Sequence, residues 1–208
     1  MAEAHGSQYN TYINELNNNT GLSWHGVFQP HCPAGAWNGS WCNTTEDEGV
    51  VVLSSLPDQG SSGGYLPYAD AWHSARAWAR LSLGVGGVTT HVFGTHLQVG
   101  NLTARNLSMS YFQSVTGNLS GPKFVAGDFN ADPDQIDTTS GMRPSFVDSW
   151  GLLNSTRGFT CSTPYPTMKL DYWFMDQSGR ITPNWSSVVT WMGTLSDHFP
   201  VHASFKVR

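Results

Sequence analysis

The chain has 208 residues and a formal net charge of −5, and only 12% of its residues are charged. This length suits a single domain spanning residues 1–208 with a substantial core. Its ten lysines and arginines are scattered rather than gathered into a basic stripe. That distribution argues against a tight, non-catalytic nucleic-acid binder. The many glycine and tryptophan residues are typical of a β-rich, loop-rich protein and exclude a helical bundle or a disordered chain.

The hydrophobic pattern predicts strands grouped in hairpins with helices inserted between them. In chain order we predict a helix over 8–17, a loop that contains two cysteines, a buried strand over 49–54 and a glycine- and serine-rich loop over 59–70. A hairpin of strands over 75–83 and 89–97 precedes a helix over 104–115, a strand over 123–126, a helix over 146–153 and strands over 170–175, 188–192 and 201–207. This order favours an α+β layered sandwich over regular βαβ units. No apolar run is long enough to span a membrane, so no membrane partner is expected.

Three cysteines, Cys32, Cys42 and Cys161, make an odd number. Cys32 and Cys42 flank an aromatic loop and belong to no Cys-x-x-Cys pair, so we interpret them as a disulfide rather than as zinc ligands. A disulfide requires an oxidising compartment and would suit a secreted protein; the alternative is two reduced thiols in a cytosolic loop. Residues 1–6 show no signal-peptide pattern, so the compartment stays open. Cys161 is then expected to be a buried free thiol.

Polar side chains gather where the predicted strands end. The four clusters are Thr95-His96-Leu97-Gln98, Gly127-Asp128-Phe129-Asn130, Leu170-Asp171-Tyr172 and Ser196-Asp197-His198. Each cluster taken alone can be explained without a catalytic role, as a turn, a cap or a paired buried side chain. Together they supply metal ligands, a general base and phosphate contacts at the kind of position where active sites are assembled. A carboxylate within an apolar strand must be paired or metal-bound, because an unpaired buried charge is costly.

These clusters, in this order, resemble the endonuclease/exonuclease/phosphatase family, which includes deoxyribonuclease I and exonuclease III. The Gly127-Asp128-Phe129-Asn130 and Ser196-Asp197-His198 segments are the most specific, and the resemblance runs from about residue 8 to the C-terminus. It implies a deoxyribonuclease I-like sandwich of two packed mixed β-sheets flanked by helices. It also implies a hydrolase that uses Mg²⁺ or Mn²⁺, because carboxylate and amide oxygens suit hard cations.

The resemblance assigns the catalytic roles residue by residue. Asp128 is expected to orient or deprotonate the attacking water, and Asn130 to donate to a phosphate oxygen. Asp197 is expected to bind the metal, with Asp128 and Asn130 beside it. His198 is expected to contact the scissile phosphate, either as general base or as stabiliser of the pentacovalent state. Asp171 resembles the carboxylate that holds this histidine in one tautomer.

Further residues are implied by their place in the family pattern. His96 matches a second histidine beside the phosphate, Arg76 stands where some members have a phosphate contact, and Glu48 stands where deoxyribonuclease-like members pair a glutamate with the first histidine. The family usually begins with a strand carrying an asparagine, for which this chain has no residues, followed by a strand that ends in a metal-binding glutamate. Glu3 stands at that glutamate's place, either as the ligand or as a tail residue. We therefore expect one sheet to lack a central strand and metal binding to be weak, with a preference for Mn²⁺.

Three functions remain open from the sequence. The first is a nuclease acting on DNA, as an exonuclease or an endonuclease. The second is a phosphodiesterase or phosphatase that acts on a lipid or sugar phosphate. The third is a catalytically impaired remnant that only binds DNA. The sequence implies no stable protein partner and leaves the oligomeric state open.

Overall fold

A six-stranded mixed sheet forms the centre of the molecule in the computed structural model, which describes residues 4–32, 48–67, 75–139, 142, 145–193 and 195–208. The strands follow the spatial order β4 (Asp58–Tyr65), β5 (Ala77–Val85), β6 (Val88–His96), β7 (Lys123–Asp128), β9 (Asp171–Asp176) and β8 (Phe146–Asp148). β6 and β7 run parallel, and the other neighbouring pairs are antiparallel. The parallel pair therefore brings the ends of β6 and β7 to the same edge of the sheet.

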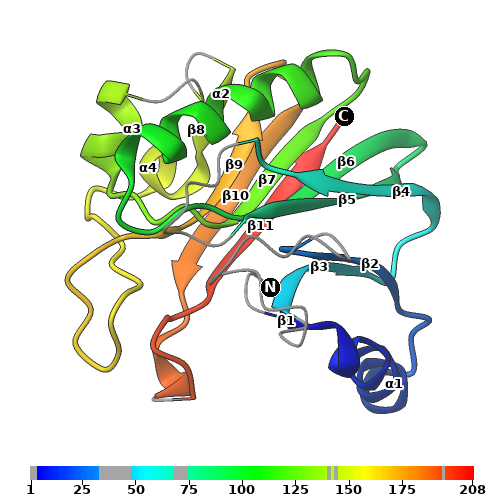
Figure 1. Ribbon diagram of the computed structural model, residues 1–208. Coiled ribbons are helices and arrows are strands. Elements are labelled where there is room, and N and C mark those ends of the chain that lie inside the picture. The colour runs from blue at the N-terminus through cyan, green and yellow to red at the C-terminus, as the bar shows by residue number, and fades with distance from the viewer. Residues whose placement is uncertain (1–3, 33–47, 68–74, 140–141, 143–144, 194) are drawn as a thin grey trace.

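A second β layer faces this sheet and is divided into two parts (Figure 1). One part pairs β1 (Ala4–His5), β3 (Glu48–Ser54) and β2 (His25–Pro30), and the other is the hairpin of β10 (Ile181–Val188) and β11 (Val201–Val207). A groove of about 320 Å³ is lined by residues of β3 and of the start of β11, together with β6, β7 and β9 of the central sheet. Among the described residues, no strand joins these two parts.

Helices cover the opposite face of the six-stranded sheet. α2 (Leu102–Gly117) and α3 (Pro133–Thr139) lie on that face, whereas α1 (Tyr9–Thr20) lies beside β2 in the other layer (Figure 1). α4 (Ser149–Leu153) lies at the β8 side of the sheet and contacts β8, β9 and β10. The side chain of Asn101 caps α2 by accepting a hydrogen bond from the backbone N–H of Ala104 at 3.0 Å. Within the described ranges, no helix combines the length and the apolar character needed to cross a bilayer.

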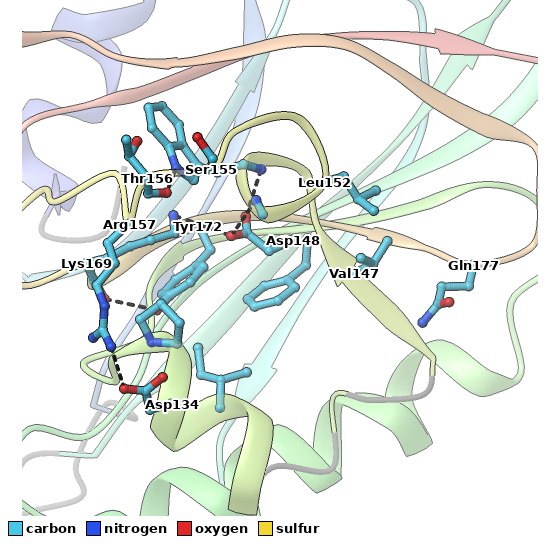
Figure 2. A pocket seen from close by; sticks show the side chains of 15 residues that line it. Asp134, Val147, Asp148, Leu152, Ser155, Thr156, Arg157, Lys169, Tyr172 and Gln177 are labelled. Atoms are coloured by element: carbon cyan, nitrogen blue, oxygen red, sulfur yellow. Dashed lines mark hydrogen bonds and ion pairs between the residues drawn. The ribbon is translucent and has the colours of Figure 1, made fainter.

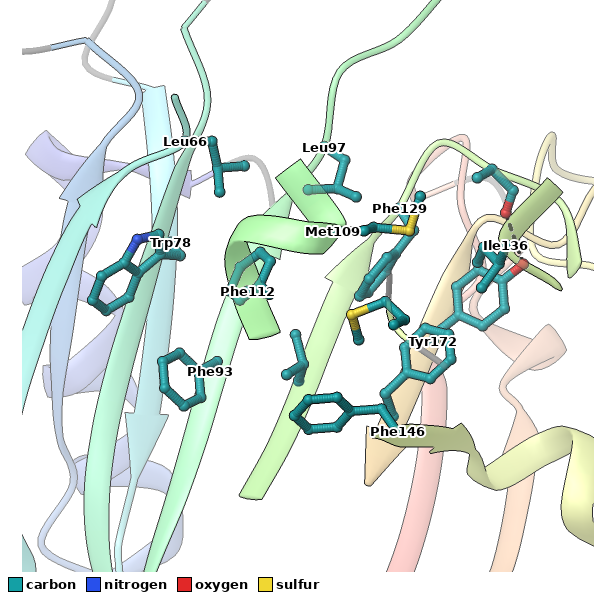
Figure 3. Packing of buried hydrophobic residues seen from close by; sticks show 14 residues of the cluster. Leu66, Trp78, Phe93, Leu97, Met109, Phe112, Phe129, Ile136, Phe146 and Tyr172 are labelled. Atoms are coloured by element: carbon teal, nitrogen blue, oxygen red, sulfur yellow. Dashed lines mark hydrogen bonds between the residues drawn. The ribbon is translucent and has the colours of Figure 1, made fainter. Parts of the chain in front are cut away.

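The period-two alternation of the strands divides the core into two levels. On β5, Trp78 faces α2, whereas Leu81 and Leu83 face β3. On β7, Val125 joins the helix-facing cluster and Phe124 packs toward β10 and β11. Figure 3 shows the helix-facing cluster, which is rich in aromatic and sulfur-containing side chains. Both faces of the central sheet are thus covered by apolar contacts, which fixes its strand ends in place.

The structure confirms the layered α+β class and places helices or strands at most of the predicted positions. The predicted helix over 8–17 is part of α1, the hairpin is β5 with β6, and the strand over 123–126 continues to Asp128 as β7. The structure also contains α3, which we did not predict.

Four predicted segments were wrong. The predicted 59–70 loop contains most of the exposed edge strand β4, seven of whose eight residues pair with β5 despite their glycine and serine content. The loop predicted after the first helix contains β2, which pairs with β3. The predicted helix over 146–153 begins as strand β8, because the Asp148 side chain accepts from Trp150 and Gly151 N–H groups and starts α4 only at Ser149. The predicted strand over 188–192 is instead the end of β10 followed by a 3-10 turn, Thr190–Met192.

Candidate active site

Three ionisable side chains lie in a row across adjacent strands. In the parallel β6–β7 register His96 stands opposite Asp128, and in the antiparallel β7–β9 register Asp128 stands opposite Asp171. These positions are the last residues of β6 and β7 and the first residue of β9. The strand pairing therefore brings together three of the residues that the sequence singled out.

A glycine lets β7 approach β6 closely beside this row. Gly127 has a φ of 139°, and a Cβ atom at that position would lie 1.9 Å from the carbonyl oxygen of Thr95. Only glycine combines this backbone conformation with so short an approach. The Gly-Asp pair in the sequence thus has a structural cause: the residue before Asp128 must lack a side chain.

The chain turns sharply after Asp128 and carries Asn130 into the site. The Asp128 Oδ1 atom accepts from the Asn130 backbone N–H at 2.7 Å, and Asn130 has a positive φ of 48°, which asparagine tolerates better than most residues. The Asn130 Nδ2 atom donates to the Leu97 carbonyl oxygen at 3.0 Å, which fixes the direction of the amide. One N–H of this amide is used in that bond, so the other N–H and the amide oxygen are left to act in the site.

His198 is held by Asp171. The Nδ1 atom of His198 lies 2.7 Å from the Asp171 Oδ2 atom, and 24% of the His198 side chain is exposed. The hydrogen bond to Asp171 raises the pKa of His198 to about 9, with further contributions from the negative charges of Asp171, Asp128 and Asp197, against an opposing effect of burial. His198 is therefore an imidazolium at neutral pH, with its Nε2–H free to point at an anion.

His96 lies between Arg76 and Asp128. An Arg76 guanidinium nitrogen lies 3.0 Å from the His96 Nδ1 atom, and the His96 Nε2 atom lies 3.5 Å from the Asp128 Oδ2 atom. Since a guanidinium can only donate, Nδ1 accepts and the single ring proton of neutral His96 sits on Nε2, facing the carboxylate. Two of the residues that the sequence assigned to phosphate binding, Arg76 and His96, therefore contact each other directly.

His31 is a buried residue of this region that the sequence analysis missed. It follows β2 directly, its N–H donates to the Glu48 carbonyl oxygen at 2.9 Å, and its ring meets that of His96 edge-on with centroids 5.5 Å apart. Burial, and then the positive charge of Arg76, lower the pKa of His31 to about 3, so its ring is neutral. No spacing pattern marks His31 in the sequence, and the strand that precedes it was predicted as loop.

The side chain of His31 is only 4% exposed, and neither of its ring nitrogens has a hydrogen-bond partner among the described residues. A buried polar group without a partner costs about 1–3 kcal/mol. Such a group is uncommon enough in folded proteins to call for an explanation.

The remaining predicted residues fall in different places. Asp197 is exposed beside His198, where its carbonyl oxygen accepts from the Thr163 N–H at 2.9 Å. Glu3 and Cys42 lie outside the described residues. Cys32 is disulfide-bonded, and Cys161 is a buried free thiol whose pKa is raised by burial.

The carboxylates suit a hard divalent cation. Asp128, Asp171 and His198 each offer a ligand-type atom, and these atoms lie within 4.8 Å of one another. Because Asp171 already binds His198, the Asp128 carboxylate and the Asn130 amide oxygen beside it are groups suited to hold Mg²⁺ or Mn²⁺. Oxygen donors of this kind fit the metal that the sequence implied, and Asp197 stays a predicted further ligand.

A larger cavity lies away from this cluster, against α4 and β8 (Figure 2). Its volume is about 690 Å³, and Lys169, which is 1% exposed, lies at its wall. The Lys169 ammonium donates to the Asp171 carbonyl oxygen at 3.0 Å, lies 3.6 Å from the Asp148 carboxylate and sits 4.1 Å above the Tyr172 ring. All of these contacts are internal, so Lys169 supports the start of β9.

The family follows from a direct comparison of sequences. The sequence profile of the Endonuclease/Exonuclease/phosphatase family matches residues 12–198, which include the full row of strand-end residues. The chain belongs to this family. The search of curated proteins found no match to this chain.

Solved structures with the same fold include both phosphatases and DNA-processing proteins. An endonuclease/exonuclease/phosphatase from Bacteroides vulgatus aligns with a TM-score of 0.74 at 17% identity, over 100% of this chain and 84% of its own. The mannosyl-6-phosphatase Bt3783 of Bacteroides thetaiotaomicron aligns with a TM-score of 0.69 at 14% identity, over 95% and 82%. A D. rerio TDP2 complexed with single strand DNA product aligns with a TM-score of 0.67 at 15% identity, over 99% and 84%. At these identities the likeness establishes the fold, and the deoxyribonuclease I-like architecture is confirmed.

Proposed function

We propose that this family member is a divalent-metal-dependent phosphodiester hydrolase that acts on DNA. The observation that carries the proposal is the Asp171–His198 pair, which lies beside Asp128 and Asn130 at one edge of the central sheet. Hydrolysis of a phosphodiester requires an activated water, neutralised non-bridging oxygens and stabilisation of the leaving group. The named side chains offer a group for each requirement.

His198 is suited to bind and stabilise the phosphate. With a pKa of about 9 its ring carries a positive charge at neutral pH, so it can donate a charge-assisted hydrogen bond to a phosphate oxygen. The general-base role requires the neutral ring, which predominates only above about pH 9. Of the two roles considered from the sequence, the raised pKa favours stabilisation of the pentacovalent state.

Asp128 is suited to orient the attacking water. One of its carboxylate oxygens is held by the Asn130 N–H, and the other faces His96 at 3.5 Å. Arg76 would neutralise a second phosphate oxygen, and the neutral His96 ring at the same strand end could donate a hydrogen bond beside it. The metal, when bound at Asp128 and Asp197, would supply Lewis-acid stabilisation of the charge that develops on the phosphate.

DNA is the favoured substrate because a structure of this fold, D. rerio TDP2, is complexed with a single strand DNA product. The net charge of −5 is compatible with a nuclease that holds one scissile phosphate through local donors and releases its product. A sugar phosphate is the second candidate, because Bt3783, another structure of this fold, is a mannosyl-6-phosphatase.

The test compares linear duplex DNA, circular duplex DNA and mannose 6-phosphate with Mg²⁺, with Mn²⁺ or with EDTA. Metal-dependent loss of linear DNA alone identifies an exonuclease, and nicking of circles identifies an endonuclease. His198→Ala should abolish cleavage, whereas His202→Ala on the exposed face of β11 should not. Hydrolysis of mannose 6-phosphate without DNA cleavage would contradict the nuclease and favour a sugar-phosphate phosphatase instead. Binding of DNA without cleavage under every metal condition would indicate an impaired enzyme.

A further inference from the structure

Three potential metal ligands meet beside the proposed catalytic cluster, and each comes from a different strand region. His31 follows β2, Glu48 begins β3 and His96 ends β6. Each offers one ligand-type atom, and these atoms lie within 4.8 Å of one another. We propose that His31, Glu48 and His96 form a second metal site, specific for a transition-metal dication such as Zn²⁺, Co²⁺ or Mn²⁺.

His31 supplies the independent observation. Its side chain is 96% buried, since only 4% is exposed, and both ring nitrogens lack a partner among the described residues. The Glu48 carboxylate, which lies next to it, likewise makes no hydrogen bond or ion pair with a described residue. The buried His31 ring and the half-buried Glu48 carboxylate therefore lie within 4.8 Å of each other with no bond between them. A bound cation would satisfy both.

The ligand types select the metal. Two imidazoles with one carboxylate are typical of zinc, cobalt, iron and manganese sites, whereas Mg²⁺ prefers oxygen ligands. Zinc ligands lie about 2.0–2.2 Å from the ion, so tetrahedral donors are about 3.5 Å apart. The three atoms lie within 4.8 Å of one another, so the side chains would close around a bound ion. The oxygen-rich set at Asp128 and Asp197 remains available to Mg²⁺.

Arg76 competes with the cation for His96. Its guanidinium donates to the His96 Nδ1 atom at 3.0 Å, which leaves the ring proton on Nε2. Neutral His96 has one lone pair, so it cannot accept from Arg76 and bind a metal at the same time. Metal binding therefore requires Arg76 to release His96, and removal of the guanidinium should tighten binding.

The experiment measures Zn²⁺ and Co²⁺ binding by titration calorimetry and by visible Co²⁺ absorption, on the full chain without substrate and with excess Mg²⁺ present. We expect one tight site in the wild type, and a loss of affinity of at least about tenfold in both His31→Ala and Glu48→Gln. Arg76→Met should bind at least about threefold more tightly, because a like charge and a competing donor are gone. His202→Ala, an exposed histidine on β11, is the matched control and should bind like the wild type.

Circular dichroism establishes whether each variant is folded. If His31→Ala does not fold, the metal affinity of Glu48→Gln still tests the site. No Zn²⁺ or Co²⁺ binding by the wild type beyond that of Mg²⁺ would overturn the site. Unchanged affinity in folded His31→Ala or Glu48→Gln would overturn it as well. Because no substrate is present, these results are independent of whether the protein cleaves DNA.

Discussion

The hydrogen bond between Asp171 and His198 is the interaction whose removal should have the clearest effect. It spans 2.7 Å and is the largest of the influences that raise the pKa of His198 to about 9. Asp171→Asn keeps the size of the side chain and removes its charge. Burial then remains as the main influence and acts in the opposite direction, so the pKa of His198 should fall to its ordinary value of about 6.5 or below.

The same bond links stability to pH. The folded-state pKa of His198 is raised, so its contribution to stability is fully present below about pH 6.5 and is lost as the pH rises to about 9. At 1.36 kcal/mol per pH unit the full interval would give about 3.4 kcal/mol. Because the ring is partly exposed to solvent, we reduce this to about 1–2 kcal/mol. For a domain of this size that corresponds to a fall in Tm of about 2–8 °C between pH 6.5 and pH 9.

The assay follows the His198 ring protons by NMR as the metal-free protein is titrated, with His198→Gln used to assign the signals. Thermal unfolding at matched pH values measures the stability change. Asp171→Asn should lower the pKa of His198 and remove most of its contribution to the decrease in Tm between pH 6.5 and pH 9. A His198 pKa that stays near 9 in Asp171→Asn would refute the reasoning, because the charge of Asp171 would then not be its cause.

Three further substitutions test other parts of the account. Arg76→Met should lower kcat/KM for the phosphoester about tenfold to a hundredfold in steady-state assays, because a charge-assisted phosphate contact is lost. Gly127→Ala should destabilise the fold by more than about 3 kcal/mol in denaturant titrations, because its Cβ would meet the Thr95 carbonyl oxygen; Gly117→Ala, which meets nothing within 4 Å, should leave the stability unchanged or slightly higher. Phe112→Ala should lower the free energy of unfolding by about 3–5 kcal/mol in the same titrations, because it leaves a cavity where a fully buried side chain of α2 packs in the core. An unchanged midpoint for Gly127→Ala or Phe112→Ala would contradict the packing described for these positions.

The central sheet was predictable because its strands carry apolar runs and end in polar clusters. The Asp128 cluster follows an uninterrupted apolar strand, and Asp171 begins the next strand of the same sheet. A family resemblance added the order of the clusters, which periodicity alone does not supply. The sequence therefore indicated which residues would share one edge of the sheet.

The parts that sequence reasoning missed depend on long-range pairing. β4 is glycine-rich and exposed, and it is a strand only because β5 offers it seven residues of ladder partners. β8 is only three residues long and ends at Asp148. The side chain of Asp148 caps α4 through the N–H groups of Trp150 and Gly151, and the sequence alone does not show these hydrogen bonds. Short and exposed elements carry too few apolar residues for a period to show.

His31 was missed for a related reason. A histidine before a cysteine has no distinctive spacing, and its importance lies in three-dimensional contact with Glu48 and His96. The contact between Arg76 and His96 likewise joins residues twenty positions apart through the β5–β6 hairpin. Such relations become visible only once the register of the sheets is known.

The most direct test of the central claim is the initial rate of DNA hydrolysis by the wild type and by His198→Gln, each with Mg²⁺ and again after EDTA. We expect EDTA to abolish wild-type cleavage and His198→Gln to lower the rate with Mg²⁺ by at least about a hundredfold. His202→Gln, which alters an exposed histidine on β11, should cleave at the wild-type rate. Cleavage that survives EDTA, or a His198→Gln rate equal to the wild-type rate, would contradict a metal-dependent phosphodiesterase built on this site.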